Sequence, residues 1–164
     1  MCWSMPASIL MVVAGTAVTG VAVWRREPAA IPMTIGYFTV MEALQAAGYW
    51  VIDDCDSSAN RFITLLSYLH IVFQPFFINA FAMQLIPISV QQKVKRPVYL
   101  ACGVSSVVML MQLYPFSWAG SCEVGQALCG SPLCLVSGEW HLAWNIPYND
   151  LLGSLDDLLG THLS

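Results

Sequence analysis

The chain has 164 residues, of which 57% are hydrophobic and only 10% charged, and its mean hydropathy is +0.65. This composition lies outside the range of soluble domains and indicates an integral membrane protein whose main partner is the lipid bilayer. The net charge is −4, and six Lys and Arg residues are too few to form a phosphate-binding stripe, so nucleic acid is excluded as a partner.

Four apolar segments predict an all-α integral membrane fold with four transmembrane helices, at about residues 5–24, 31–52, 62–88 and 97–116. A helix rises about 1.5 Å per residue, so about twenty residues cross a hydrocarbon core of roughly 30 Å. No Lys or Arg precedes the first segment, which is therefore expected to be a retained span rather than a cleaved signal peptide. Pro97 is expected in the first turn of the fourth helix, where its missing N–H costs nothing.

Residues 1–149 are predicted to form a single multi-pass domain, and residues 150–164 a separate C-terminal amphipathic segment. In this tail the leucines share one helical face and the central aspartates point away from it, the pattern of a helix that lies on a membrane surface. A truncated continuation of the membrane domain is the alternative interpretation.

The basic residues predict the orientation of the chain. The loops after the first and third predicted helices carry Arg25, Arg26, Lys93, Lys95 and Arg96. The positive-inside rule puts these two loops in the cytoplasm, so the N-terminus and the loop 117–140 are expected on the opposite side. The predicted location is a bacterial inner membrane.

The orientation gathers five cysteines on the oxidising side of the membrane: Cys2, Cys55, Cys122, Cys129 and Cys134. Such a set predicts disulfides, most simply one within residues 122–134 and a second that ties this loop to Cys55 or Cys2. Zinc is disfavoured because the spacing lacks the paired C-x2-C pattern of a zinc site.

Two ionisable residues lie inside predicted helices. Glu42 and His70 are at nearly equal depth, roughly 12 to 14 Å below the outer surface at about 1.5 Å per residue. A charge at the bilayer centre costs roughly 2.5 to 3.5 kcal/mol, so Glu42 is expected to be protonated or to have a partner. His70 is the best placed candidate.

Helical spacing extends this pair into a polar cluster. Gln74 and Ser67 lie about one turn from His70, and Gln45 lies one turn from Glu42. The favoured hypothesis is that the buried cluster binds or relays a proton, an ion or a small ligand, since Glu and His exchange protons near physiological pH. Hydrogen bonds that merely pack helices, worth about 0.6 kcal/mol each, are the alternative and describe a structural or assembly protein.

Two further alternatives remain open. Glu42 and His70, together with His141, offer ligands for a metal ion, although their spacing matches no motif. Ser67 and His70 form an S-x-x-H pattern that is loosely similar to membrane hydrolases of the alkaline ceramidase type, so a fragment of a metal-dependent hydrolase is conceivable. The clustered histidines and the aspartate that this family needs in later helices do not follow, and an enzyme is not favoured. The sequence indicates no cofactor.

Several segments resemble one uncharacterised family: the opening MCWSMPAS, then GYFTVMEALQAAGYWVID, LSYLHIVFQPFFINAFAM and GEWHLAWNIPYN. The chain is similar over about residues 1–149 to bacterial multi-pass membrane proteins that begin Met-Cys-aromatic-Ser. This resemblance implies a multi-pass membrane fold and brings no established activity, cofactor or catalytic residue. Assembly with further copies of the chain is compatible with it.

Overall fold

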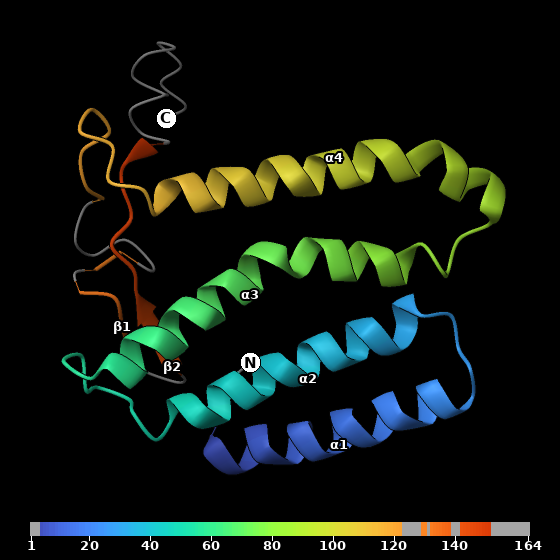
Figure 1. Cartoon of the computed structure of the whole chain (residues 1–164), viewed down its shortest axis with the longest axis horizontal. Helices are drawn as coiled ribbons and strands as arrows, with labels where there is room; N and C mark the ends of the chain where they lie inside the picture. Colours follow the sequence, from blue (N-terminus) through green and yellow to red (C-terminus); the bar gives the residue numbers. More distant parts are fainter. Residues whose placement is uncertain (1–3, 123–128, 131, 139–141, 152–164) are drawn as a thin grey trace.

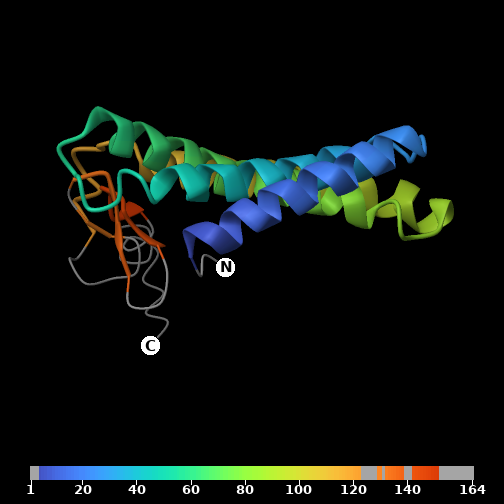
Figure 2. The same cartoon turned by 90° about the horizontal axis from the view of Figure 1, so that it is seen from below.

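The computed structural model describes residues 4–122, 129–130, 132–138 and 142–151. Within them the chain forms, in order, α1 (Met5–Trp24), α2 (Ala30–Gly48), α3 (Ser58–Ala82), α4 (Ile88–Gln112), β1 (Cys134–Ser137) and β2 (Leu142–Asn145). The helices lie side by side in chain order, each antiparallel to the one before it (Figure 1). Both views place the strands at one end of the helices, where α2 ends and α3 begins (Figure 2).

Three of the helices, α1, α3 and α4, are long and apolar enough to cross a membrane. Their outward faces carry large exposed apolar side chains such as Leu10 and Leu100, which are 67% and 70% exposed. A contiguous apolar surface of this kind is costly in water and is the normal state of a helix in lipid. The mostly helical, membrane-associated fold that the composition predicts is thereby confirmed.

The second of the four predicted spans, at residues 31–52, is not supported. The helix in this region ends at Gly48, so Val51 and Ile52, which counted toward the predicted span, lie in turns beyond it. The polar Glu42 and Gln45 remain inside the shorter helix. The shorter helix therefore lacks the apolar residues at its end but keeps the polar ones. Its mean hydropathy is for this reason below that of the three candidate spans.

Other boundaries also differ from the sequence-based ones. The first helix agrees with the predicted residues 5–24, but α3 and α4 both begin earlier than expected, at Ser58 and Ile88. Pro97 is consequently inside α4 rather than in its first turn. The basic segment before it is helical because Gln, Lys and Arg are good helix formers. Pro75 lies inside α3, which changes direction along its length in Figure 1.

The outer loop predicted at residues 117–140 contains part of a β-hairpin. β1 pairs antiparallel with β2, with Leu135 opposite Trp144. Leu135 and Leu142 are buried against Tyr49 and Ile52 at the end of α2. We call residues 132–138 and 142–151 the cap. Of the predicted amphipathic tail, residues 152–164 lie outside the described residues.

α1 and α2 approach each other closely at small residues. A Cβ atom added to Gly15 would lie 2.2 Å from Thr39 Oγ1, and one added to Gly36 would lie 3.6 Å from Thr19 Cγ2. Small side chains let membrane helices pack backbone to backbone, which maximises van der Waals contact where the hydrophobic effect contributes little.

The substitution Gly15→Val is expected to lower the free energy of unfolding by about 1–3 kcal/mol, because the new side chain overlaps Thr39. The matched control is Gly20→Val on the same helix, since a Cβ at Gly20 meets no atom within 4 Å. Equilibrium unfolding in mixed micelles measures both. Equal losses from the two variants would show that helix propensity, not the α1–α2 contact, is responsible.

Candidate functional site

The interface between α2 and α3 is built around Tyr37. The Tyr37 ring stacks on His70 and on Phe77, with centroid distances of 3.6 and 3.7 Å, and its hydroxyl donates to the His70 carbonyl. Thr34, one turn earlier, donates to the Phe77 carbonyl at 2.9 Å. His70 and Phe77 are seven residues apart, so both rings lie on one face of α3. These contacts fix how the two helices face each other.

Three of the predicted site residues are buried. Gln45, Ser67 and His70 are 5%, 2% and 8% exposed. A Cβ at Gly48 would lie 3.8 Å from Ile63, so the residues one turn further in, Gln45 and Ser67, are at the same level. His70 follows one turn deeper. Ser67 and His70 thus lie one turn apart on α3, and helix rise places the buried Gln45 at about the level of Ser67.

Two side-chain atoms of these three residues lack a partner. Gln45 Oε1 and His70 Nε2 are buried and have no hydrogen bond within the described residues. About nine in ten buried polar atoms in proteins have a partner, and an orphaned one costs about 1–3 kcal/mol. The unpaired atoms mark the place where a further hydrogen-bonding group fits.

Glu42 is not one of these buried residues. It lies three residues before Gln45, which at 3.6 residues per turn rotates it by about 60° around the helix axis. The Glu42 side chain lines a groove on the α1 side of α2. It forms no ion pair with His70 in the described part of the chain, and the only ion pair found there joins Arg61 to Asp56. Gln74 is half-buried on α3.

The remaining site hypotheses concern metal binding and hydrolysis. No group of three or more His, Cys, Asp or Glu side chains able to hold a metal occurs among the described residues. His141 lies outside them. Ser67 and His70 lie one turn apart on α3, and no acidic side chain bonds to His70 Nε2 there. The site roles of all these residues stay predictions.

The contact between α3 and α4 uses hydrogen bonds from side chains to backbone. Tyr68 donates to the Met109 carbonyl at 2.6 Å, and Ser106 donates to the Val72 carbonyl at 2.7 Å. Sequence reasoning missed both donors, because a tyrosine or serine in an apolar helix does not reveal which neighbour it faces. Their chemistry is that of helix packing.

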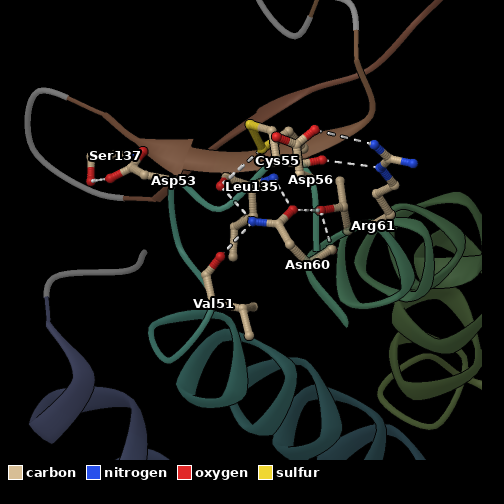
Figure 3. Close-up of a disulfide and its surroundings, with 10 residues drawn as sticks. Val51, Asp53, Cys55, Asp56, Asn60, Arg61, Leu135 and Ser137 are labelled. Atoms are coloured by element: carbon tan, nitrogen blue, oxygen red, sulfur yellow. Dashed lines mark hydrogen bonds and ion pairs between the residues drawn. A yellow bond between two sulfur atoms is a disulfide. The ribbon is translucent and has the colours of Figure 1, made fainter. Parts of the chain in front are cut away.

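Asn60, at the start of α3, holds the cap through its side-chain amide (Figure 3). Its Nδ2 donates to the carbonyls of Leu135 at 3.0 Å and Val51 at 2.6 Å, and its Oδ1 accepts from the Leu135 N–H at 2.8 Å. The amide thus pairs with Leu135 as a neighbouring strand would. Asn60 is fully buried and was overlooked in the sequence, where CDSSANR reads as a loop. The one signal that the sequence offered for Asn60 was its place close to the start of a predicted helix.

Two disulfides join cysteines that were singled out in the sequence. Cys55 pairs with Cys134, with Cα atoms 5.2 Å apart, and so links the α2–α3 turn to β1. Cys122 pairs with Cys129 within the loop that was predicted at residues 117–140. Cys102 is free and buried in α4, and Cys2 lies outside the described residues.

Asp53 adds a polar contact to the same attachment. Its carboxylate accepts hydrogen bonds from the Ser137 hydroxyl and from the Ser137 N–H, the latter at 2.7 Å. These two donors hold the pKa of Asp53 below its ordinary value. The Asp53 N–H donates to the Leu135 carbonyl at 3.0 Å. Disulfide, amide and carboxylate together fasten β1 to the loop between α2 and α3.

Helices of membrane-crossing length and a disulfide-bonded cap define a helical, membrane-associated protein. A family model matches residues 6–164, and the chain belongs to that family, a family of unknown function (DUF5765). The predicted membership of an uncharacterised family without established activity is thereby confirmed, and the match extends through the tail. No curated protein and no solved structure matches the chain.

The substitution Asn60→Leu is expected to destabilise the cap by about 1–3 kcal/mol, because it leaves the N–H and carbonyl of Leu135 without a side-chain partner. Hydrogen exchange at the Leu135 amide should accelerate accordingly. Ala59→Leu is the matched control, since it adds the same side chain at an exposed neighbouring position. Unchanged exchange in the Asn60 variant would contradict the proposed role of the amide.

Removing the Cys55–Cys134 disulfide by a double alanine substitution should destabilise the protein more than removing Cys122–Cys129. The closed loops have sequence separations of 79 and 7, for which the chain-entropy relation gives roughly 4.5 and roughly 2.5 kcal/mol. Chemical unfolding of both variants measures the difference. In the unsubstituted protein the four disulfide-bonded cysteines should resist alkylation until a reductant is added. Rapid labelling of these cysteines without reductant would reject the pairing.

Proposed function

We propose that α2 is a fourth transmembrane span, which makes this a multi-pass protein. Its 19 residues correspond to roughly 28 Å at about 1.5 Å per residue, close to the thickness of a bilayer core. Figure 1 supports this, because α2 lies alongside α1 and α3 and antiparallel to both. Of its two strongly polar side chains, Gln45 is buried and so is kept from lipid, whereas Glu42 is half-buried.

The proposed membrane is a bacterial inner membrane, with the N-terminus and the cap on the extracytoplasmic side. The α1–α2 and α3–α4 connections lie at the same end, opposite the cap (Figure 1). The basic Arg25 and Arg26 belong to the first connection, and Lys93, Lys95 and Arg96 to the beginning of α4. The positive-inside rule favours the cytoplasm for that end. Two disulfides at the other end agree with an oxidising compartment.

The biochemical function that the geometry supports best is a proton-binding or proton-relaying module at Gln45, Ser67 and His70. The observation that carries it is the pair of buried, unpartnered atoms, Gln45 Oε1 and His70 Nε2. Water is the partner that suits each atom, because it donates to the amide oxygen and either donates to or accepts from the imidazole nitrogen. Imidazole and water in contact exchange protons near neutral pH.

The packing around His70 suits this role. The Tyr37 ring holds the imidazole plane by stacking, while the Tyr37 hydroxyl is engaged by the His70 carbonyl. The imidazole is therefore oriented without any hydrogen bond to Nε2, which leaves that atom available to a solute.

A structural or assembly role is the second candidate, and it has its own observation. Thr34, Tyr37, Tyr68 and Ser106 each donate to a backbone carbonyl of a neighbouring helix. Such bonds need no ligand and stabilise helix packing by about 0.6 kcal/mol each. A protein in which all polar groups served this purpose would hold partners or helices together and move nothing.

Proton flux into liposomes that contain the purified protein and a pH-sensitive dye tests the proposal. The wild-type protein should conduct protons under an imposed potential, and His70→Phe, which keeps a ring against Tyr37, should reduce the flux to that of empty liposomes. Gln45→Met should weaken it in the same direction. Gln92→Met, on the exposed part of α4, is the matched control and should conduct normally.

The structural alternative predicts a different pattern. Wild-type protein would then conduct no better than empty liposomes, which would overturn the proposed function. Each single substitution at Gln45 or His70 would leave the other polar group buried, and the double variant Gln45→Met, His70→Phe would recover stability. Thermal unfolding of the wild-type protein, the two single variants and the double variant distinguishes this outcome from a simple failure to fold.

A further inference from the structure

A groove of about 520 Å³ lies on the other side of α2, against α1. Its wall consists of Met11, Ala14, Gly15 and Val18 of α1, Thr34, Ile35, Phe38, Thr39 and Glu42 of α2, and Phe81 of α3. This volume is within the range of roughly 300–1,000 Å³ that is typical of small-molecule sites. The lining is apolar except for one carboxyl group and two hydroxyls.

The two hydroxyls of the groove wall have no proton left to donate to a ligand. The Thr34 hydroxyl donates to the Phe77 carbonyl at 2.9 Å, and the Thr39 hydroxyl donates to the Ile35 carbonyl at 2.8 Å. Each hydroxyl has only one proton, so neither can donate to a ligand as well. An ionised Glu42 is likewise an acceptor only. A ligand that fits this wall must therefore bring the donors.

Glu42 also lacks a counter-charge. It forms no ion pair and no hydrogen bond in the part of the chain that the structure describes, although it is half-buried among apolar side chains. An unpaired carboxylate at membrane depth is unfavourable, and a cation placed beside it removes much of the penalty. Charge and hydrogen-bonding capacity thus select the same kind of ligand.

We propose that this groove binds an amphipathic ammonium compound, with its cationic headgroup at Glu42 and its apolar body along α1 and α2. A neutral lipid chain brings no donor for Glu42, and an anionic amphiphile is repelled by it. A divalent metal ion needs about six oxygen ligands, whereas this wall offers one carboxylate. Ala14 and Gly15 of α1 are small residues in this wall.

This inference does not rest on the proton-relay proposal, because the groove wall includes Glu42 but none of Gln45, Ser67 and His70. A negative result in one experiment therefore does not affect the other proposal. The His70→Phe variant is expected to bind the ammonium probe normally.

Calorimetric titration of the full-length protein in phosphatidylcholine nanodiscs provides the test, with empty discs as the reference for partitioning. The probes are decylammonium, decanol and decanoate, which share a chain and differ in the headgroup. Decylammonium should bind saturably with one site per chain, and the other two should give only the partitioning heat of empty discs. Equal binding of decanol and decylammonium would overturn the role of the charge.

Three variants locate the site. Glu42→Gln should weaken decylammonium binding at least about tenfold, whereas Glu27→Gln, which removes the same charge from an exposed loop, should leave it unchanged. Ala14→Phe, at an exposed position of the wall, keeps Glu42 but fills the groove and should also abolish saturable binding. Unchanged affinity in Glu42→Gln, or in Ala14→Phe with a native melting temperature, would reject the proposal.

Discussion

Polar groups inside this helical bundle must find their partners within the protein, because hydrocarbon offers no hydrogen bonds. The structure meets this constraint at most positions through side chains that donate to backbone carbonyls of a neighbouring helix, as Tyr68 and Ser106 do between α3 and α4. The few groups that do not comply are therefore informative. Among the described residues, the buried side-chain atoms without a hydrogen bond are Gln45 Oε1 in α2, His70 Nε2 in α3 and Trp144 Nε1 in the cap, and Glu42 of α2 has no ion pair.

The cap depends on the same constraint. β1 has only one partner strand, so the backbone groups of Leu135 on its other edge would be buried without bonds. Asn60 and the N–H of Asp53 supply them from the bundle, and the Cys55–Cys134 disulfide keeps the two parts together. Substitutions at these positions should consequently loosen the cap before they affect the helices.

α2 separates two environments. Toward α3 it presents Tyr37 to a closed interface with an orphaned atom, and toward α1 it presents Glu42 to an apolar groove. The first environment suits a small protic solute and the second a hydrophobic cation. The polar residues of α2 also lower its hydropathy, and without Val51 and Ile52 the helix falls short of the three candidate spans.

The sequence by itself determined the membrane character, the bounds of α1, the cysteines that pair and the polar positions, because these follow from composition and local patterns. Only the tertiary structure decided that Glu42 lines the groove beside α1 and forms no ion pair with His70 within the described residues. It also decided that α2 ends at Gly48 and that Asn60 binds a distant strand. Residue counts show whether two side chains on neighbouring helices lie at equal depth. Whether the two side chains face each other depends on the rotation of each helix about its axis. That rotation is fixed by contacts such as Tyr37 with His70, which involve residues far apart in the chain.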